Sequence, residues 1–130
     1  MHKMKTMKNI ILLLLLVISM AASAQDLKTL VPKGSKIFLQ VNEQSTYKKA
    51  HDNLAKWGYW QIVDNKKDAD FKLKVTMIVT GTGFNTAWAD FYAKDNENVF
   101  TTRSVSLTVN LDAFETINEL IHKQLKGVVE

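Results

Sequence analysis

The 130-residue sequence contains no cysteine, one proline and no acidic residue before Asp26. Without cysteine the chain cannot form disulfide bonds, a zinc site with thiolate ligands, a thiol nucleophile or a lipid anchor on an N-terminal cysteine. A small domain that lacks these supports depends on its hydrophobic core for stability. No internal repeat, linker or low-complexity tract divides the sequence, so we expect one domain over residues 25–130.

The first 24 residues have the three parts of a secretory signal peptide. Three lysines lie before residue 10, an apolar run covers residues 10–18, and Ala22-Ser23-Ala24 supplies the small residues that signal peptidase accepts. The alternative is an uncleaved anchor, but the run is shorter than the roughly 20 residues of a membrane-spanning helix. We therefore predict cleavage before Gln25 and export to the periplasm or beyond. The exported protein is expected to be neither a lipoprotein nor stably inserted in a membrane.

The basic character of the chain belongs mainly to this leader. The whole sequence has a formal net charge of +4 at pH 7, whereas residues 25–130 hold 14 basic and 13 acidic side chains, a net charge of +1. A near-neutral domain lacks the electrostatic signature of a nucleic-acid-binding protein. We therefore expect no nucleic acid among its partners.

The remaining sequence predicts an α+β domain. A strand over residues 36–41 is followed by a helix that begins near Ser45 or Thr46 and ends before Gly58, and by a strand over residues 59–63. Strict alternation predicts three further strands over residues 71–80, 84–94 and 99–109, and an apolar helical stripe follows from residue 112. The order β-α-β-β-β-β-α predicts a two-layer sandwich whose mostly antiparallel sheet has both helices on one face.

Two short turns set a register for the last three strands. If residues 79 and 84 pair across the first turn, and residues 94 and 99 across the second, Val75 lies beside Trp88 and Trp88 beside Val105. The same register places Asp90 opposite Arg103 on the apolar face. That pair is predicted to be a structural ion pair at the end of the core, with a ligand pocket as the alternative.

Two surfaces are candidates for binding. Aromatic residues gather where the first helix meets the second strand, and they either stack on a partner or close the core. The sheet face away from the helices is flat and partly polar, and it is either a packing surface or simply solvated. The candidate binding residues are Trp57, Tyr59, Trp60, Lys72, Lys74, Ala89, Phe91 and Phe100.

Two sequence strings carry a resemblance to known exported domains. Residues 59–64 read Tyr-Trp-Gln-Ile-Val-Asp, and residues 68–73 read Asp-Ala-Asp-Phe-Lys-Leu. With the preceding helix, this stretch is similar over residues 36–80 to small α/β modules of Gram-negative envelope proteins. These include envelope lipoproteins, the N-terminal domain of the Tol-system propeller protein and secreted domains without a known function. The resemblance implies an envelope binding or assembly module and carries no catalytic residues.

No motif for catalysis, cofactor binding or metal binding accompanies the titratable residues. His51 and His122 lie one on each predicted helix without a metal-binding pattern, so we expect both at the surface or at the edge of the core. The acidic segment over residues 64–70 lacks the spacing and glycine of a calcium loop, and Gly81-Thr82-Gly83 reads as a hairpin turn. We therefore predict a protein without enzyme activity, cofactor or metal.

The predicted function is an exported module that binds another envelope protein, or itself, through the open sheet face or through the aromatic residues between the first helix and the second strand. The alternative is a small ligand-binding protein or hydrolase with a cleft between helices and sheet, using Asp90, Arg103 or the histidines.

The leader prediction has a direct test. We expect an expressing bacterium to release a chain that begins at Gln25 into its periplasm or medium, because Ala22-Ser23-Ala24 precedes the predicted cleavage site. The N-terminal residue is then either glutamine or the pyroglutamate that forms from it. Mass spectrometry of the exported chain measures this. Recovery of the chain in the membrane fraction with its first residues still attached would contradict it.

Overall fold

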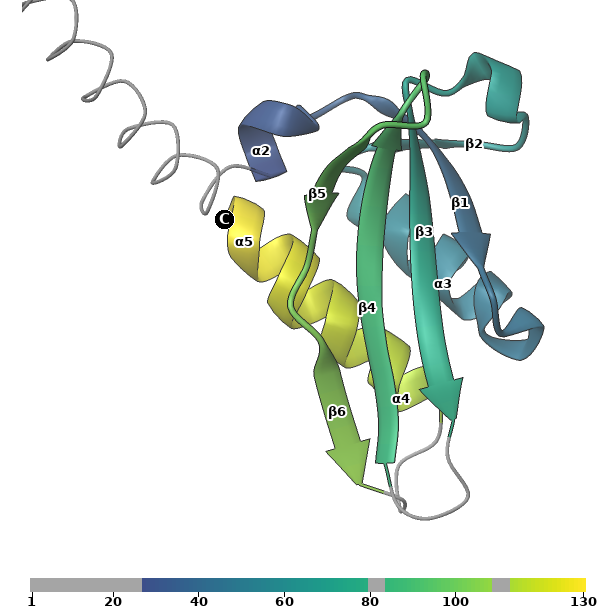
Figure 1. The fold of residues 1–130 in the computed structure, drawn as a ribbon, viewed down its shortest axis with the longest axis vertical. Coiled ribbons are helices and arrows are strands. Elements are labelled where there is room, and N and C mark those ends of the chain that lie inside the picture. The colour runs from purple at the N-terminus through teal and green to yellow at the C-terminus, as the bar shows by residue number, and fades with distance from the viewer. Residues whose placement is uncertain (1–26, 80–83, 109–112) are drawn as a thin grey trace, which may run out of the picture.

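The computed structural model describes residues 27–79, 84–108 and 113–130, and in these ranges it has one mixed sheet with helices packed on one side (Figure 1). The strand order is β2-β1-β3-β4-β5, and β6 also pairs with β4. β1 is parallel to both β2 and β3, and the remaining pairs are antiparallel. The strands are β1 (Lys36–Val41), β2 (Gln61–Val63), β3 (Phe71–Val79), β4 (Phe84–Ala93), β5 (Asn98–Thr101) and β6 (Val105–Thr108).

This architecture confirms the predicted α+β fold with a mostly antiparallel sheet. The predicted signal peptide, the predicted turn at residues 80–83 and the expected start of the last helix at Asp112 lie outside the described residues. The helical segments are α2 (Leu27–Leu30), α3 (Gln44–Trp57), η1 (Lys66–Asp68), α4 (Ala113–Glu119), η2 (Leu120–Lys126) and α5 (Gly127–Val129).

Helix α3 lies where the sequence predicted a helix. Thr46, Ala50 and Leu54 recur every four residues and are buried, so they form one face against the sheet. Gly58 ends the helix with a left-handed φ of 70°, and its N–H donates to the Leu54 carbonyl over 3.1 Å. The glycine removes the Cβ clash that this backbone conformation imposes on other residues.

The C-terminal helical segments form one continuous run behind the sheet. α4 passes directly into η2, a π-helix, and then into α5, with buried Ile117, Leu120, Ile121 and Leu125 against the core. Gly127 does not end this run, because its φ of −66° is right-handed and the helix continues through it.

The segment before β1, for which the sequence analysis predicted no helix or strand, contributes to the core. Leu27 and Val31 are fully buried, and the indole Nε1 of Trp60 donates to the Val31 carbonyl over 2.9 Å. α2 thereby packs beside α5 and β5 (Figure 1). A short helix of four residues has little stability of its own, so these contacts hold it.

The observed register differs from the predicted one by one residue between β3 and β4 and between β4 and β6, and by two to three residues between β4 and β5. Val75 pairs with Ala89 rather than with Trp88, and Val105 pairs with Ala87. Because side chains alternate between faces, a shift of one residue exchanges the two faces of a strand. Ala87, Ala89 and Phe91 therefore face the helices and are fully buried, whereas Trp88 and its even-numbered neighbours in β4 face away.

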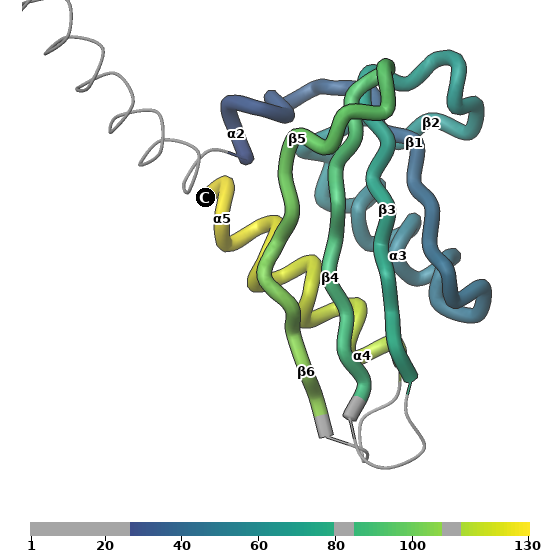
Figure 2. Tube along the Cα trace, in the orientation of Figure 1, coloured from purple at the N-terminus to yellow at the C-terminus, as the bar shows by residue number. Residues whose placement is uncertain are grey.

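The strand predicted over residues 99–109 is divided into β5 and β6. Between them, Thr102 pairs with Ala89 through two hydrogen bonds of 2.9 Å, one from its own N–H and one to its hydroxyl oxygen. The ladder with β4 also shifts between Phe91 and Tyr92. These irregularities bend the edge of the sheet (Figure 2).

Neighbouring residues of β4 provide a test of the face assignment. We expect Phe91→Ala to lower the free energy of unfolding by about 3–5 kcal/mol, because it leaves a cavity in the core. Tyr92→Ala, on the opposite face, is expected to cost about 1 kcal/mol. Urea unfolding measures both changes. If the register predicted from the sequence were correct, Tyr92→Ala would lower the free energy of unfolding more than Phe91→Ala.

A buried hydroxyl provides a second stability test. In the part of the chain that the structure describes, Thr116 has the one fully buried side-chain oxygen without a hydrogen-bond partner. We expect Thr116→Val to leave stability unchanged or raise it by about 1 kcal/mol, since no hydrogen bond is lost. The matched variant Thr46→Val removes the bond from the Thr46 hydroxyl to the Glu43 carbonyl and is expected to cost about 1 kcal/mol in urea unfolding. An equal loss in both variants would contradict the assignment.

Candidate functional site

The aromatic residues of the two candidate surfaces meet in one continuous cluster. Trp57 stacks on Tyr59 with ring centroids 4.9 Å apart, and Trp60 contacts both rings edge to face. Trp60 also contacts Phe91 at 5.3 Å, and Phe91 contacts Phe100 at 6.2 Å. The junction between α3 and β2 is thus joined through the core to the middle of the sheet.

Most of this cluster serves the core rather than a binding surface. Trp60 and Phe91 are buried, and Trp57, Tyr59 and Phe100 are partly buried against the same core. Large aromatic side chains contribute much of the buried apolar area in a small domain. Trp57, Tyr59 and Trp60 therefore belong mainly to the core of the fold.

The face of the sheet away from the helices remains uncovered by any described helix, and we call it the open face. Of the predicted binding residues, Lys72 and Lys74 lie on it. Ala89, Phe91 and Phe100 were wrongly placed there, because Ala89 and Phe91 are fully buried and Phe100 pairs with Phe91 and packs against the core. The one-residue difference in register is the reason. The open face includes Phe38, Gln40, Lys72, Lys74, Thr76, Ile78, Thr86, Trp88, Asp90, Tyr92, Thr101 and Ser106.

Rows of side chains cross the open face from strand to strand. Phe38, Lys72 and Tyr92 form one row, and the Lys72 Nζ lies 4.9 Å from the centre of the Tyr92 ring. Thr76 pairs with Trp88 in another row. The aromatic rings on this face are partly exposed, and Ile78 is 47% exposed.

The predicted ion pair between Asp90 and Arg103 is wrong. Asp90 lies on the open face opposite Lys74 and Thr101, and its Oδ1 accepts hydrogen bonds from Thr101 Oγ1 at 2.6 Å and Asn98 Nδ2 at 3.5 Å. Arg103 is exposed in the link between β5 and β6, and none of the ion pairs among the described residues includes it. In the observed register Asp90 is not on the apolar face, so its carboxylate needs no buried countercharge.

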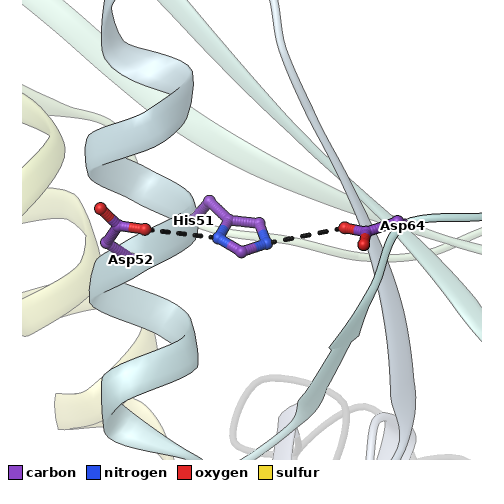
Figure 3. Close-up of polar contacts among 3 residues, drawn as sticks. All are labelled: His51, Asp52 and Asp64. Atoms are coloured by element: carbon purple, nitrogen blue, oxygen red, sulfur yellow. Dashed lines mark ion pairs between the residues drawn. The ribbon is translucent and has the colours of Figure 1, made fainter.

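His51 lies between two carboxylates at the edge of the core (Figure 3). Its Nδ1 is 3.5 Å from Asp52 Oδ1 on the same helix, and its Nε2 is 3.9 Å from Asp64 Oδ1 beyond β2. A general base in a hydrolytic triad needs one ring nitrogen directed at a nucleophilic hydroxyl. Here both nitrogens face carboxylates, so the arrangement does not form such a triad.

A cavity of about 430 Å³ lies between α3 and the C-terminal helix, beside His122. Asn53 Nδ2 donates to Asn118 Oδ1 over 2.6 Å and joins the two helices there. The lining residues are Lys49, Asp52, Asn53, Lys56, Asn118, Ile121, His122 and Lys126. They include neither a serine nor a threonine, so this concave site has no hydroxyl nucleophile of its own.

A second cavity, of about 460 Å³, lies at the end of the sheet where β3 begins and β4 ends. Segment η1 and the turn between β4 and β5 form its sides. The sequence analysis did not find this site, because its residues come from two segments more than 20 positions apart, and neither segment carries a motif.

The described residues contain no group of three or more histidine and acidic side chains placed to hold a metal ion. Within the same ranges, none of the helices has the length and apolar character required to cross a bilayer. Neither observation identifies a site.

Several residues of the open face were missed in the sequence. Phe38, Trp88 and Tyr92 are partly exposed on it. The available signal was the alternation of β4, in which the even-numbered residues Trp88, Asp90 and Tyr92 point to the same face. That signal is ambiguous because the odd-numbered residues, which include Ala89 and Phe91, are also apolar.

Comparisons with known proteins place the fold but not a family. No protein-family model matches the chain, and no curated protein matches it. Among solved structures, the chain is similar to a variant of PelC from Paraburkholderia phytofirmans, which was solved as a dodecamer. The TM-score is 0.50 with 14% sequence identity, and the match covers 73% of this chain and 86% of the PelC chain. The chain and PelC are similar in fold. The resemblance of residues 36–80 to envelope modules stays a prediction.

Proposed function

We propose that this protein is an exported, non-catalytic assembly module that binds a second copy of itself through the open face. The observation that carries the proposal is the uneven coverage of the sheet. α3 and the C-terminal helix pack on one face, and the other face presents partly exposed aromatic and aliphatic side chains. A sheet face with this composition is typical of surfaces that pack against another protein.

The chemistry of the open face suits a second copy. It carries positive charge at Lys72 and Lys74 and negative charge at Asp90 within neighbouring rows. In a twofold interface the same surface meets itself, so lysines of one copy can approach the carboxylate of the other. Phe38, Trp88 and Tyr92 supply rigid apolar area between these charges.

Two further observations support the proposal. The leader predicts export, and a small cysteine-free module in the envelope gains stability from association. The PelC chain with a similar fold was solved as a dodecamer, so this fold is compatible with assembly. The proposal itself depends on the open face, since the two chains are only 14% identical.

Ile78→Lys tests the proposal at an exposed position of the open face. We expect sedimentation equilibrium to show a dimer or larger assembly for the wild-type exported chain at micromolar concentration. Ile78→Lys should weaken association at least about tenfold, because it places a desolvated charge in an apolar interface. Phe91 is unsuitable for this purpose, because its replacement by a charged residue would disrupt the core.

The matched control is Phe114→Lys on α4. Phe114 is 41% exposed and Ile78 is 47% exposed, but Phe114 belongs to the helix layer. The control should retain the wild-type mass. A wild-type monomer throughout the concentration range would overturn the proposal, as would an equal loss of association in both variants.

A further inference from the structure

The cavity at the end of the sheet has a strong excess of positive charge. Its ionisable lining residues are Lys66, Lys67, Lys72, Lys94 and Asp70. Among the ion pairs of the described residues, none includes any of these four lysines. Four lysines therefore line a space of about 460 Å³. The Nζ of Lys72 lies over the Tyr92 ring, whereas no ion pair or cation–π contact among the described residues includes Lys66, Lys67 or Lys94.

The one carboxylate in the lining is already engaged by the backbone. Asp70 Oδ2 accepts a hydrogen bond from the N–H of Lys36 over 2.9 Å, and this bond ties the start of β3 to the start of β1. Asp68 lies in η1, and Asp95 and Glu97 lie in the turn after β4, but none of the three lines the cavity. Asp95 Oδ1 accepts from the Glu97 N–H over 3.0 Å, which folds that carboxylate back onto its own turn.

Apolar groups line the same space. Ala69 is 5% exposed, and the cross-strand neighbours Phe71 and Ala93 are partly buried. The hydrocarbon stems of the lysines extend this apolar lining while their ammonium groups remain near water. A fully hydrated inorganic ion would leave the apolar part of the cavity without a contact.

We propose that this cavity binds an anionic amphiphile, a molecule with one phosphate or carboxylate group on an apolar body. The apolar body lies against Ala69, Phe71 and Ala93, and the anionic group lies among the lysines. Lysine acts as a mobile point charge rather than a rigid fork, so the site recognises negative charge more than the geometry of one acid. Both phosphate and carboxylate heads therefore fit.

The cavity and the self-association surface share Lys72 and otherwise consist of different residues. Lys66 lies in η1 and Lys94 follows β4, and neither belongs to the open face. Lys72 borders both surfaces and is therefore left unchanged in the test. Amphiphile binding and assembly can fail independently, because the first is read from ligand titration and the second from mass.

The experiment is calorimetric titration of the exported chain with dodecyl phosphate and with dodecanoate, each below its micelle concentration. Dodecyl maltoside tests the apolar body without charge, and inorganic phosphate tests the charge without an apolar body. We expect the two anionic amphiphiles to bind and the other two probes to bind at least about tenfold more weakly. The two anionic probes also show which acid is preferred.

The double variant Lys66→Gln with Lys94→Gln should weaken binding of the anionic amphiphiles at least about tenfold. The matched control is Lys28→Gln with Lys48→Gln, which removes the same charge from exposed lysines of α2 and α3. The control should bind as the wild type does. Urea unfolding verifies that both variants are folded. The proposal is overturned if neither anionic probe binds, if dodecyl maltoside binds equally well, or if the two double variants behave alike.

Discussion

Strand β4 can bury only one of its faces, and the rest of the structure depends on which one it buries. β4 pairs with β3, β5 and β6, so its orientation sets the faces of all four strands. Burying Trp88 and Tyr92 would also bury Asp90, and an ionised carboxylate in an apolar core is expensive without a partner. Burying Ala87, Ala89 and Phe91 leaves the carboxylate at the surface, where Thr101 and Asn98 donate to it.

The consequences of this choice reach both layers. Small side chains at positions 87 and 89 let the helices approach the sheet closely, and Phe91 continues the aromatic contacts from Trp60 to Phe100. Trp60 in turn holds the segment before β1 through the Val31 carbonyl. The opposite face keeps Trp88 and Tyr92 beside lysines, and these residues give it the mixed character of an interface.

Some features of the candidate sites could be predicted and others could not. Alternation identified Lys72 and Lys74 as outward-facing residues of β3, and the structure places them on the open face. It could not orient β4, where both parities contain apolar residues, so Ala89 and Phe91 were placed outside and Asp90 was paired with Arg103. The lysine-lined cavity has no local signal, because two loops far apart in the sequence meet only when β3 pairs with β4.

The sequence by itself determined the α+β class, the order of the strands along the chain, the end of α3 at Gly58 and the absence of disulfide chemistry. These follow from local periodicity, from backbone preferences and from composition, and none requires knowledge of a distant contact. The tertiary structure decided the register of β4, the division of the last strand into β5 and β6, and the burial of Leu27 and Val31. Each of these depends on how much apolar surface is buried when segments far apart in the sequence pack into one core.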